Sequence, residues 1–189
     1  LLKLVMDKTD TDLRSEAVTT LGSMAKDYPE TLKNLFDLMS DAEIGTDAST
    51  AMSRCGKDAL PFLLKGLRSQ ESGLRLRSAR AIAGIGEAAA EANPLLLQLL
   101  ENSSPREKIT YLYALACILK SGGKYVEELV DITEKNMHDK ELVNASSGYL
   151  SNLGPKASGG AGLLLEIIVR SSEEDLKDVW SVPQRSFAT

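Results

Sequence analysis

The sequence has few of the residues that carry metal, thiol or acid–base chemistry. Its 189 residues include one histidine, two cysteines and one tryptophan. His138 has no second histidine or cysteine at metal-ligand spacing, so we expect no metal site and no cofactor. Cys55 falls at a core position, and Cys117 has no histidine to activate it. The sequence therefore predicts a non-enzymatic protein. Two cysteines do not indicate a disulfide framework, which favours a reducing, cytoplasmic setting.

Excess positive charge and long apolar runs are also absent. The chain has 22 Lys and Arg against 27 Asp and Glu, a net charge of −5. This balance argues against nucleic acid as a partner, because phosphate contacts need a basic surface. No run of 18 apolar residues exists, so we expect no membrane span. Aromatic residues make up only 5% of the chain, and its apolar content is mainly Leu and Ala, which favours helices.

One pattern occurs five times along the chain: an acid or Ser, an apolar residue three places later, then a helix rich in small residues. Equivalent positions in the copies are spaced by 31, 30, 33 and 35 residues; they are Arg14, Gly45, Arg75, Lys108 and Val143. A period of this length is typical of solenoids. The predicted fold is all-α, an α-solenoid (superhelix) of about five stacked antiparallel helix pairs, forming a single array over residues 1–189.

Each pair is expected to contain a first helix A and a second helix B. The apolar spacing places the B helices at about 13–25, 44–55, 74–85, 107–119 and 142–153, and the A helices at about 29–40, 58–69, 88–101, 124–136 and 160–171. Capping or turn-forming residues precede the B helices, namely Asp10, Asp41, Glu71, Ser104 and Asp139. Glycines suited to a C-cap follow four of them: Gly56, Gly86, Gly122 and Gly154.

These copies resemble the HEAT repeat, in particular the short bacterial variety related to phycobilisome-lyase repeats. The first and third copies match the family's pattern of an acid, an apolar residue, Arg and an Ala-rich helix, whereas Gly45, Lys108 and Val143 depart from it at the Arg position. The resemblance covers nearly the whole chain. It implies that Arg14 and Arg75 bond to an acid or turn of a neighbouring repeat, and that the outer side of the B helices is a concave wall. HEAT arrays serve many unrelated tasks, so it leaves function open.

The expected wall is uneven in composition. Its third and fourth copies combine apolar, aromatic and basic side chains, and neighbouring copies add two more residues; the candidates are Leu76, Arg77, Arg80, Ile109, Tyr113, Tyr149 and Arg54. Tyr and Arg are enriched where proteins bind each other. We therefore expect a binding surface here. The alternative is a helix register shifted by one residue, which would bury Leu76, Ile109 and Tyr113.

The leading hypothesis is a scaffold that binds a protein or peptide along the concave B-helix surface. The resemblance suggests a second possibility, a subunit of a bilin lyase-type complex acting on phycobiliproteins. A third is a structural or regulatory segment of a larger protein. Residues 1–6 read like the second half of a helix, so we expect a fragment of a longer chain. Its uncapped ends would then permit a weak dimer.

Overall fold

The computed structural model describes residues 1–119, 123–160, 162, 163, 165 and 167, and these contain helices and no strand. The α-helices are α1 (Leu2–Met6), α2 (Thr11–Met24), α3 (Thr31–Leu38), α4 (Gly45–Arg54), α5 (Leu60–Leu67), α6 (Ser72–Ile85), α7 (Asn93–Leu100), α8 (Pro105–Ile118), α9 (Gly123–Lys135) and α10 (Lys140–Leu153). Three 3₁₀ segments accompany them: η1 (Gly56–Ala59), η2 (Gly86–Ala92) and η3 (Gly154–Gly160). The all-helical part of the prediction is confirmed.

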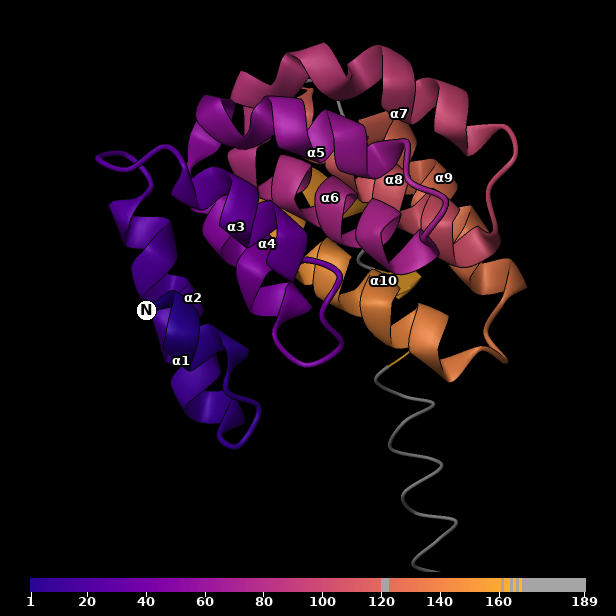
Figure 1. Ribbon diagram of the computed structural model, residues 1–189. Helices are drawn as coiled ribbons and strands as arrows, with labels where there is room; N and C mark the ends of the chain where they lie inside the picture. The colour runs from indigo at the N-terminus through magenta and orange to yellow at the C-terminus, as the bar shows by residue number, and fades with distance from the viewer. Residues whose placement is uncertain (120–122, 161, 164, 166, 168–189) are drawn as a thin grey trace, which may run out of the picture.

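The five expected B helices correspond to α2, α4, α6, α8 and α10. Their bounds agree with the predicted ranges to within two residues. Successive B helices pack against one another, α2 on α4, α4 on α6, α6 on α8 and α8 on α10. The A helices α3, α5 and α7 each pack on the B helix that follows, and Figure 1 shows α5 and α7 above α6 and α8.

Three of the five predicted capping residues cap their B helices, whereas α4 and α6 have no side-chain cap. Asp10, Ser104 and Asp139 each accept a hydrogen bond from a backbone N–H in the first turn of α2, α8 and α10. Glycines with positive φ, a backbone conformation that favours glycine, lie within two residues of the ends of α4, α6 and α10: Gly56, Gly86 and Gly154. Gly122 lies outside the described residues, as does most of the helix expected over 160–171.

Two A helices begin later than the sequence pattern predicts. The helix expected over 58–69 starts as the 3₁₀ segment η1 and becomes the α-helix α5 only at Leu60. The helix expected over 88–101 starts as the 3₁₀ segment η2 and becomes the α-helix α7 only at Asn93. Pro61 and Pro94 stand in the first turn of these two helices. Proline suits the first turn because its missing N–H has no helical partner there.

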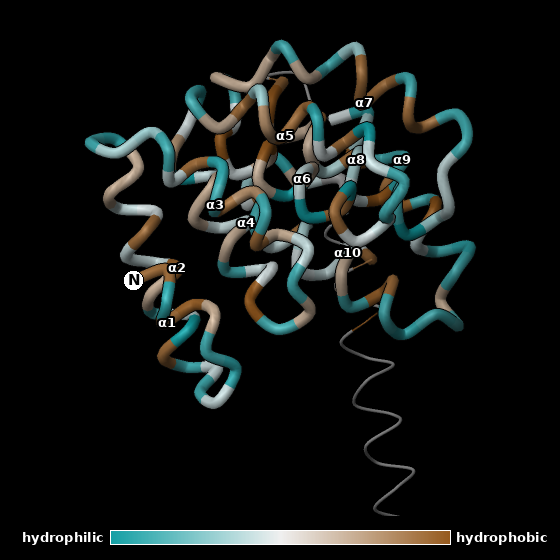
Figure 2. The backbone as a smooth tube through the Cα atoms, viewed as in Figure 1, coloured by the Kyte–Doolittle hydropathy of each residue, from teal (hydrophilic) through white to brown (hydrophobic). Residues whose placement is uncertain are grey.

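The helices pack closely because small residues lie where they meet. A Cβ added at Gly66 on α5 would lie 2.0 Å from Oγ of Ser78 on α6, and one at Gly22 on α2 would lie 2.8 Å from Cβ of Ala51 on α4. Figure 2 shows apolar and polar stretches alternating along the helices, as expected of helices that bury one face.

The N-terminal end of the described helices is apolar and exposed. Its exposed large hydrophobic residues are Leu1, Leu2, Leu4, Met6 and Leu13, each more than 40% accessible. Among the described helices, none combines the length and apolar character needed to cross a membrane.

Candidate functional site

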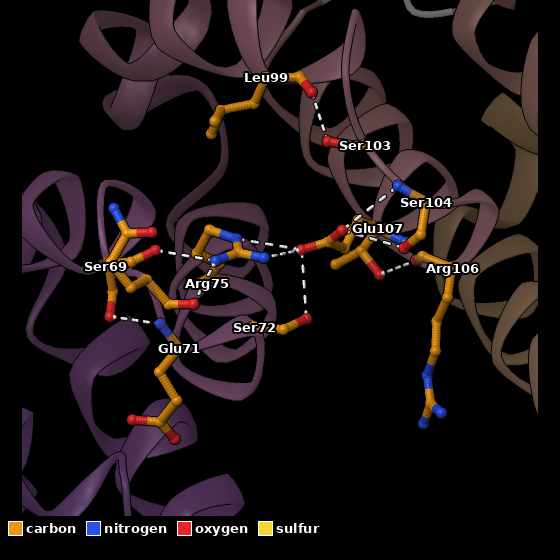
Figure 3. Close-up of polar contacts among 11 residues, drawn as sticks. Ser69, Glu71, Ser72, Arg75, Leu99, Ser103, Ser104, Arg106 and Glu107 are labelled. Atoms are coloured by element: carbon orange, nitrogen blue, oxygen red, sulfur yellow. Dashed lines mark hydrogen bonds and ion pairs between the residues drawn. The ribbon is translucent and has the colours of Figure 1, made fainter.

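The arginines at the basic position of the repeat hold neighbouring repeats together. Arg75 donates from Nε and Nη2 to Oε1 of Glu107, at 3.0 and 2.5 Å, and from Nη1 to the carbonyls of Ser69 and Gln70, both at 2.9 Å (Figure 3). The other oxygen of Glu107 accepts from the hydroxyl of Ser104 at 2.9 Å. Every nitrogen of the Arg75 guanidinium therefore has an acceptor within the protein, which makes this residue structural.

Arg14 has the same role nearer the N-terminus, on α2. Its side chain is 2% exposed and forms ion pairs with Asp41, at 2.6 Å, and with Glu43. Its Nε also donates to the carbonyl of Val5 at 2.8 Å, at the end of α1. The expected bonding of Arg14 and Arg75 to an acid and a turn is thus confirmed.

A cavity of about 540 Å³ lies beside the Arg75–Glu107 pair, between the loops that precede α6 and α8. Its lining includes Ser69, Gln70 and Ser103. Because the charged pair at its edge is already satisfied, the cavity offers a ligand no unpaired charge from Arg75 or Glu107. It is a gap between two loops that the ion pair holds together.

Arg77 is a predicted binding residue that the structure assigns to packing. It is half-buried, and its Nη1 donates to the carbonyl of Met39 at 2.8 Å, just beyond the end of α3. The guanidinium lies directly over Gly45. The side chain of Arg77 thus caps a helix end of another repeat, and its role in binding stays a prediction.

Three helices bring polar and aromatic side chains together on the B-helix side. Arg80 of α6 donates from Nε to the hydroxyl of Tyr149 on α10 at 2.9 Å, and that hydroxyl lies 3.0 Å from Oγ1 of Thr110 on α8. Thr110 donates its single hydroxyl hydrogen to the carbonyl of Arg106 at 3.0 Å. Tyr149 is therefore the donor to Thr110 and the acceptor from Arg80, so the hydrogen bonds form one directed chain.

Aromatic stacking completes this group. The rings of Tyr113 and Tyr149 are parallel to within 8°, with centroids 4.4 Å apart, and the guanidinium carbon of Arg80 lies 5.8 Å from the Tyr149 ring centre. Burial, reinforced by the neighbouring Cys117, raises the pKa of Tyr113 to about 12. Tyr113 is thus a neutral phenol at physiological pH, and it is half-buried.

The remaining predicted binding residues differ in exposure and position. Leu76 is half-buried and lies one helical turn before Arg80 on α6. Tyr149 is only 6% exposed, so it supports Arg80 and Tyr113 from below and is not an exposed anchor as predicted. Arg54 is exposed at the end of α4, where it lines a separate cavity of about 510 Å³.

Ile109 is a second correction. It is fully buried, because α8 is covered by α6, α7, α9, α10 and η2, and nine of its 14 residues are buried. The expected wall therefore does not extend across this part of α8. The signal was present in the sequence, since α8 carries apolar or aromatic residues on all sides, which is typical of a buried helix.

The two cysteines are half-buried free thiols. Burial raises the pKa of both; beside Cys117, Tyr113 and the charge of Lys156 offset part of the rise. A raised pKa disfavours the thiolate that a nucleophile needs. Cys55, expected at a buried core position, is partly accessible. His138 is exposed, and the described residues contain no group of three or more His, Cys, Asp or Glu placed to hold a metal ion.

Comparison with known proteins gives no family for this chain. No family model matches it, and no curated protein matches it. A solved structure described as the crystal structure of an engineered protein is similar over 96% of this chain and 89% of its own, with 21% sequence identity and a TM-score of 0.41. At that TM-score the likeness supports no argument about this protein.

Proposed function

We propose that this chain is a non-enzymatic scaffold, a HEAT-like α-solenoid that holds a protein or peptide on its B-helix side. The proposal depends on one observation above all: Arg80, Tyr113 and Tyr149 come from three helices and meet in one cluster. The regular contacts of each B helix with the next, and the ion pairs of Arg14 and Arg75 between repeats, support the array.

We call the surface formed by Leu76, Arg80 and Tyr113, together with the buried Tyr149 that supports them, the arginine–tyrosine face. Arg and Tyr contribute most often to the energetic centre of protein interfaces, because they combine a large contact area with directional hydrogen bonds. Here the hydrogen bond and the ring of Tyr149 already orient Arg80. A side chain that is held in place before binding loses less conformational entropy when a partner arrives.

The chemistry of the other candidates supports binding over catalysis. Burial raises the pKa of both cysteine thiols. His138 is exposed in the turn before α10 and is distant in sequence from both cysteines. Because both cysteines are free, the proposal places the protein in a reducing compartment such as the cytoplasm.

A displayed library of random peptides, panned on the immobilised chain, tests this proposal. Affinities of the selected peptides are measured by fluorescence anisotropy for wild type, Arg80→Gln and Tyr113→Ala. Two matched controls remove the same groups elsewhere: Arg68→Gln, directly after α5, whose guanidinium donates to the carbonyl of Leu64 on that helix, and Tyr28→Ala, an exposed loop residue. Circular dichroism verifies that each variant is folded.

We expect Arg80→Gln and Tyr113→Ala each to weaken binding by about tenfold or more, as at the centre of other interfaces, and the two controls to bind as wild type does. Equal effects of Arg80→Gln and Arg68→Gln would contradict the proposal. A library from which no peptide is enriched would contradict it as well.

A further inference from the structure

The Arg80 guanidinium has one edge without a protein partner. Its Nε donates to Tyr149, which in turn donates to Thr110, so the side chain is fixed in one orientation. Within the described part of the chain, neither Nη1 nor Nη2 of Arg80 has a hydrogen-bond acceptor, and no carboxylate pairs with it. The two Nη groups form a planar pair of donors that matches the two oxygens of a carboxylate.

The helices around Arg80 are basic in an acidic protein. Across α6, α8 and α10 there are six basic residues and two acidic ones, whereas the whole chain carries a net charge of −5. Both acids are already paired, Glu107 with Arg75 and Glu141 with Arg106. Lys156 adds a positive charge near Cys117, which neighbours Tyr113. The helices that carry the face therefore have an excess of positive charge, which favours an acidic partner.

We infer that the partner of the arginine–tyrosine face is an acidic peptide segment, in which an Asp or Glu carboxylate accepts hydrogen bonds from Nη1 and Nη2 of Arg80. This inference rests on the proposed function and specifies its ligand. An apolar or aromatic side chain next to the acid packs against the exposed parts of Tyr113 and Leu76, which flank Arg80. Phosphate is the weaker match, because phosphorylated motifs are usually held by clusters of arginines and the arginine–tyrosine face contains one arginine, Arg80.

Peptide selection in parallel on four full-length chains tests the inference, using wild type, Arg80→Lys, Arg80→Gln and Arg68→Gln. Peptides from wild type and Arg68→Gln should be enriched in Asp or Glu beside an apolar residue, and those from Arg80→Gln should lack this enrichment. General electrostatics would give the opposite trend, because a chain of net charge −5 repels acidic peptides.

Each selected peptide is then compared with its amide form, Asp replaced by Asn or Glu by Gln. We expect the amide form to bind wild type about tenfold or more weakly at low salt, and Arg80→Gln to bind both forms equally. For Arg80→Lys, the loss of affinity on changing acid to amide should lie between the losses of wild type and Arg80→Gln, because lysine keeps the charge but not the planar donor pair.

The outcomes separate this inference from the proposed function. Selected peptides that depend on Tyr113 but carry no excess of acid would overturn the inference and leave the scaffold proposal standing. The same holds if the amide forms bind wild type and Arg80→Gln with equal losses. A library that yields no peptide dependent on Arg80 or Tyr113 would overturn both.

Discussion

Arg77 occupies the space that a side chain at position 45 would need. A Cβ built on Gly45 would lie 2.9 Å from Nε of Arg77, closer than Cβ atoms approach other heavy atoms in proteins. Gly45 stands where the first and third copies of the repeat have arginine. With no arginine there, the guanidinium of Arg77 from the next repeat lies over the gap and donates to the carbonyl of Met39. The donor that the second copy lacks is thus supplied by its neighbour.

Substitution of Gly45 should therefore destabilise the protein. In Gly45→Ala the new methyl group would lie 2.7 Å from the carbonyl oxygen of Met39 and would displace Arg77. We expect the free energy of unfolding to fall by about 2 kcal/mol in urea denaturation, as for overpacking at other sites. Gly148→Ala is the matched control, because no atom lies within 4 Å of its Cβ position. That change should stabilise α10 by about 0.5–1 kcal/mol, and equal effects of the two substitutions would contradict the assignment.

The contact between α5 and α6 predicts a strong coupling between Gly66 and Ser78. Gly66→Ala places a Cβ 2.0 Å from Oγ of Ser78, so we expect a loss of about 1–3 kcal/mol in the free energy of unfolding. Ser78→Ala alone should be neutral or stabilising, since its buried hydroxyl has no hydrogen-bond partner among the described residues. The double variant should recover most of the loss in a double-mutant cycle. Additive effects would show that the two helices do not meet at these residues.

Stability should depend on pH through Glu107. Burial acts to raise the pKa of Glu107, but hydrogen bonds from Arg75 and Ser104 outweigh it, and the net pKa is lowered. The stabilisation is therefore fully present above the pKa of an unfolded glutamate, about 4.3, and is lost as the pH falls through the lower folded value. We expect Glu107→Gln to lower the free energy of unfolding at pH 7 by about 1–3 kcal/mol. The variant should also lose less stability than wild type on acidification, and parallel pH profiles would refute this role.

The exposed apolar residues at the N-terminal end predict weak self-association. Met6 is 68% exposed and Leu4 41% exposed, with Leu1 and Leu2 beside them. Analytical ultracentrifugation should give an average mass that rises with protein concentration for wild type. Met6→Lys should remove the rise without altering the circular dichroism, because this side chain is already exposed. A monomer at every concentration would exclude association through this end.

Local signals in the sequence were sufficient to locate the B helices. Asp10 and Asp139 accept hydrogen bonds at the predicted starts, and Gly86 has the positive φ expected at a helix end. The late starts of α5 and α7 could have been foreseen from Pro61 and Pro94, which fit a first helical turn.

The candidate site was harder to predict because its contacts are not local. Arg80 and Tyr149 are 69 residues apart, and no sequence spacing states that they share a hydrogen bond. Ile109 was assigned to the surface because its helix was considered with one buried face, whereas five elements cover α8. The packing role of Arg77 could not be predicted from local spacing, because it depends on an absent side chain in another repeat.

The most direct test of the central claim is to map a selected peptide onto the full chain by NMR, through chemical-shift changes and intermolecular contacts. We expect the largest changes at the side chains of Arg80 and Tyr113, and we expect the Arg80→Gln variant to show none of comparable size. Changes confined to the opposite, A-helix side, for example at Phe62 beside α3, would contradict it.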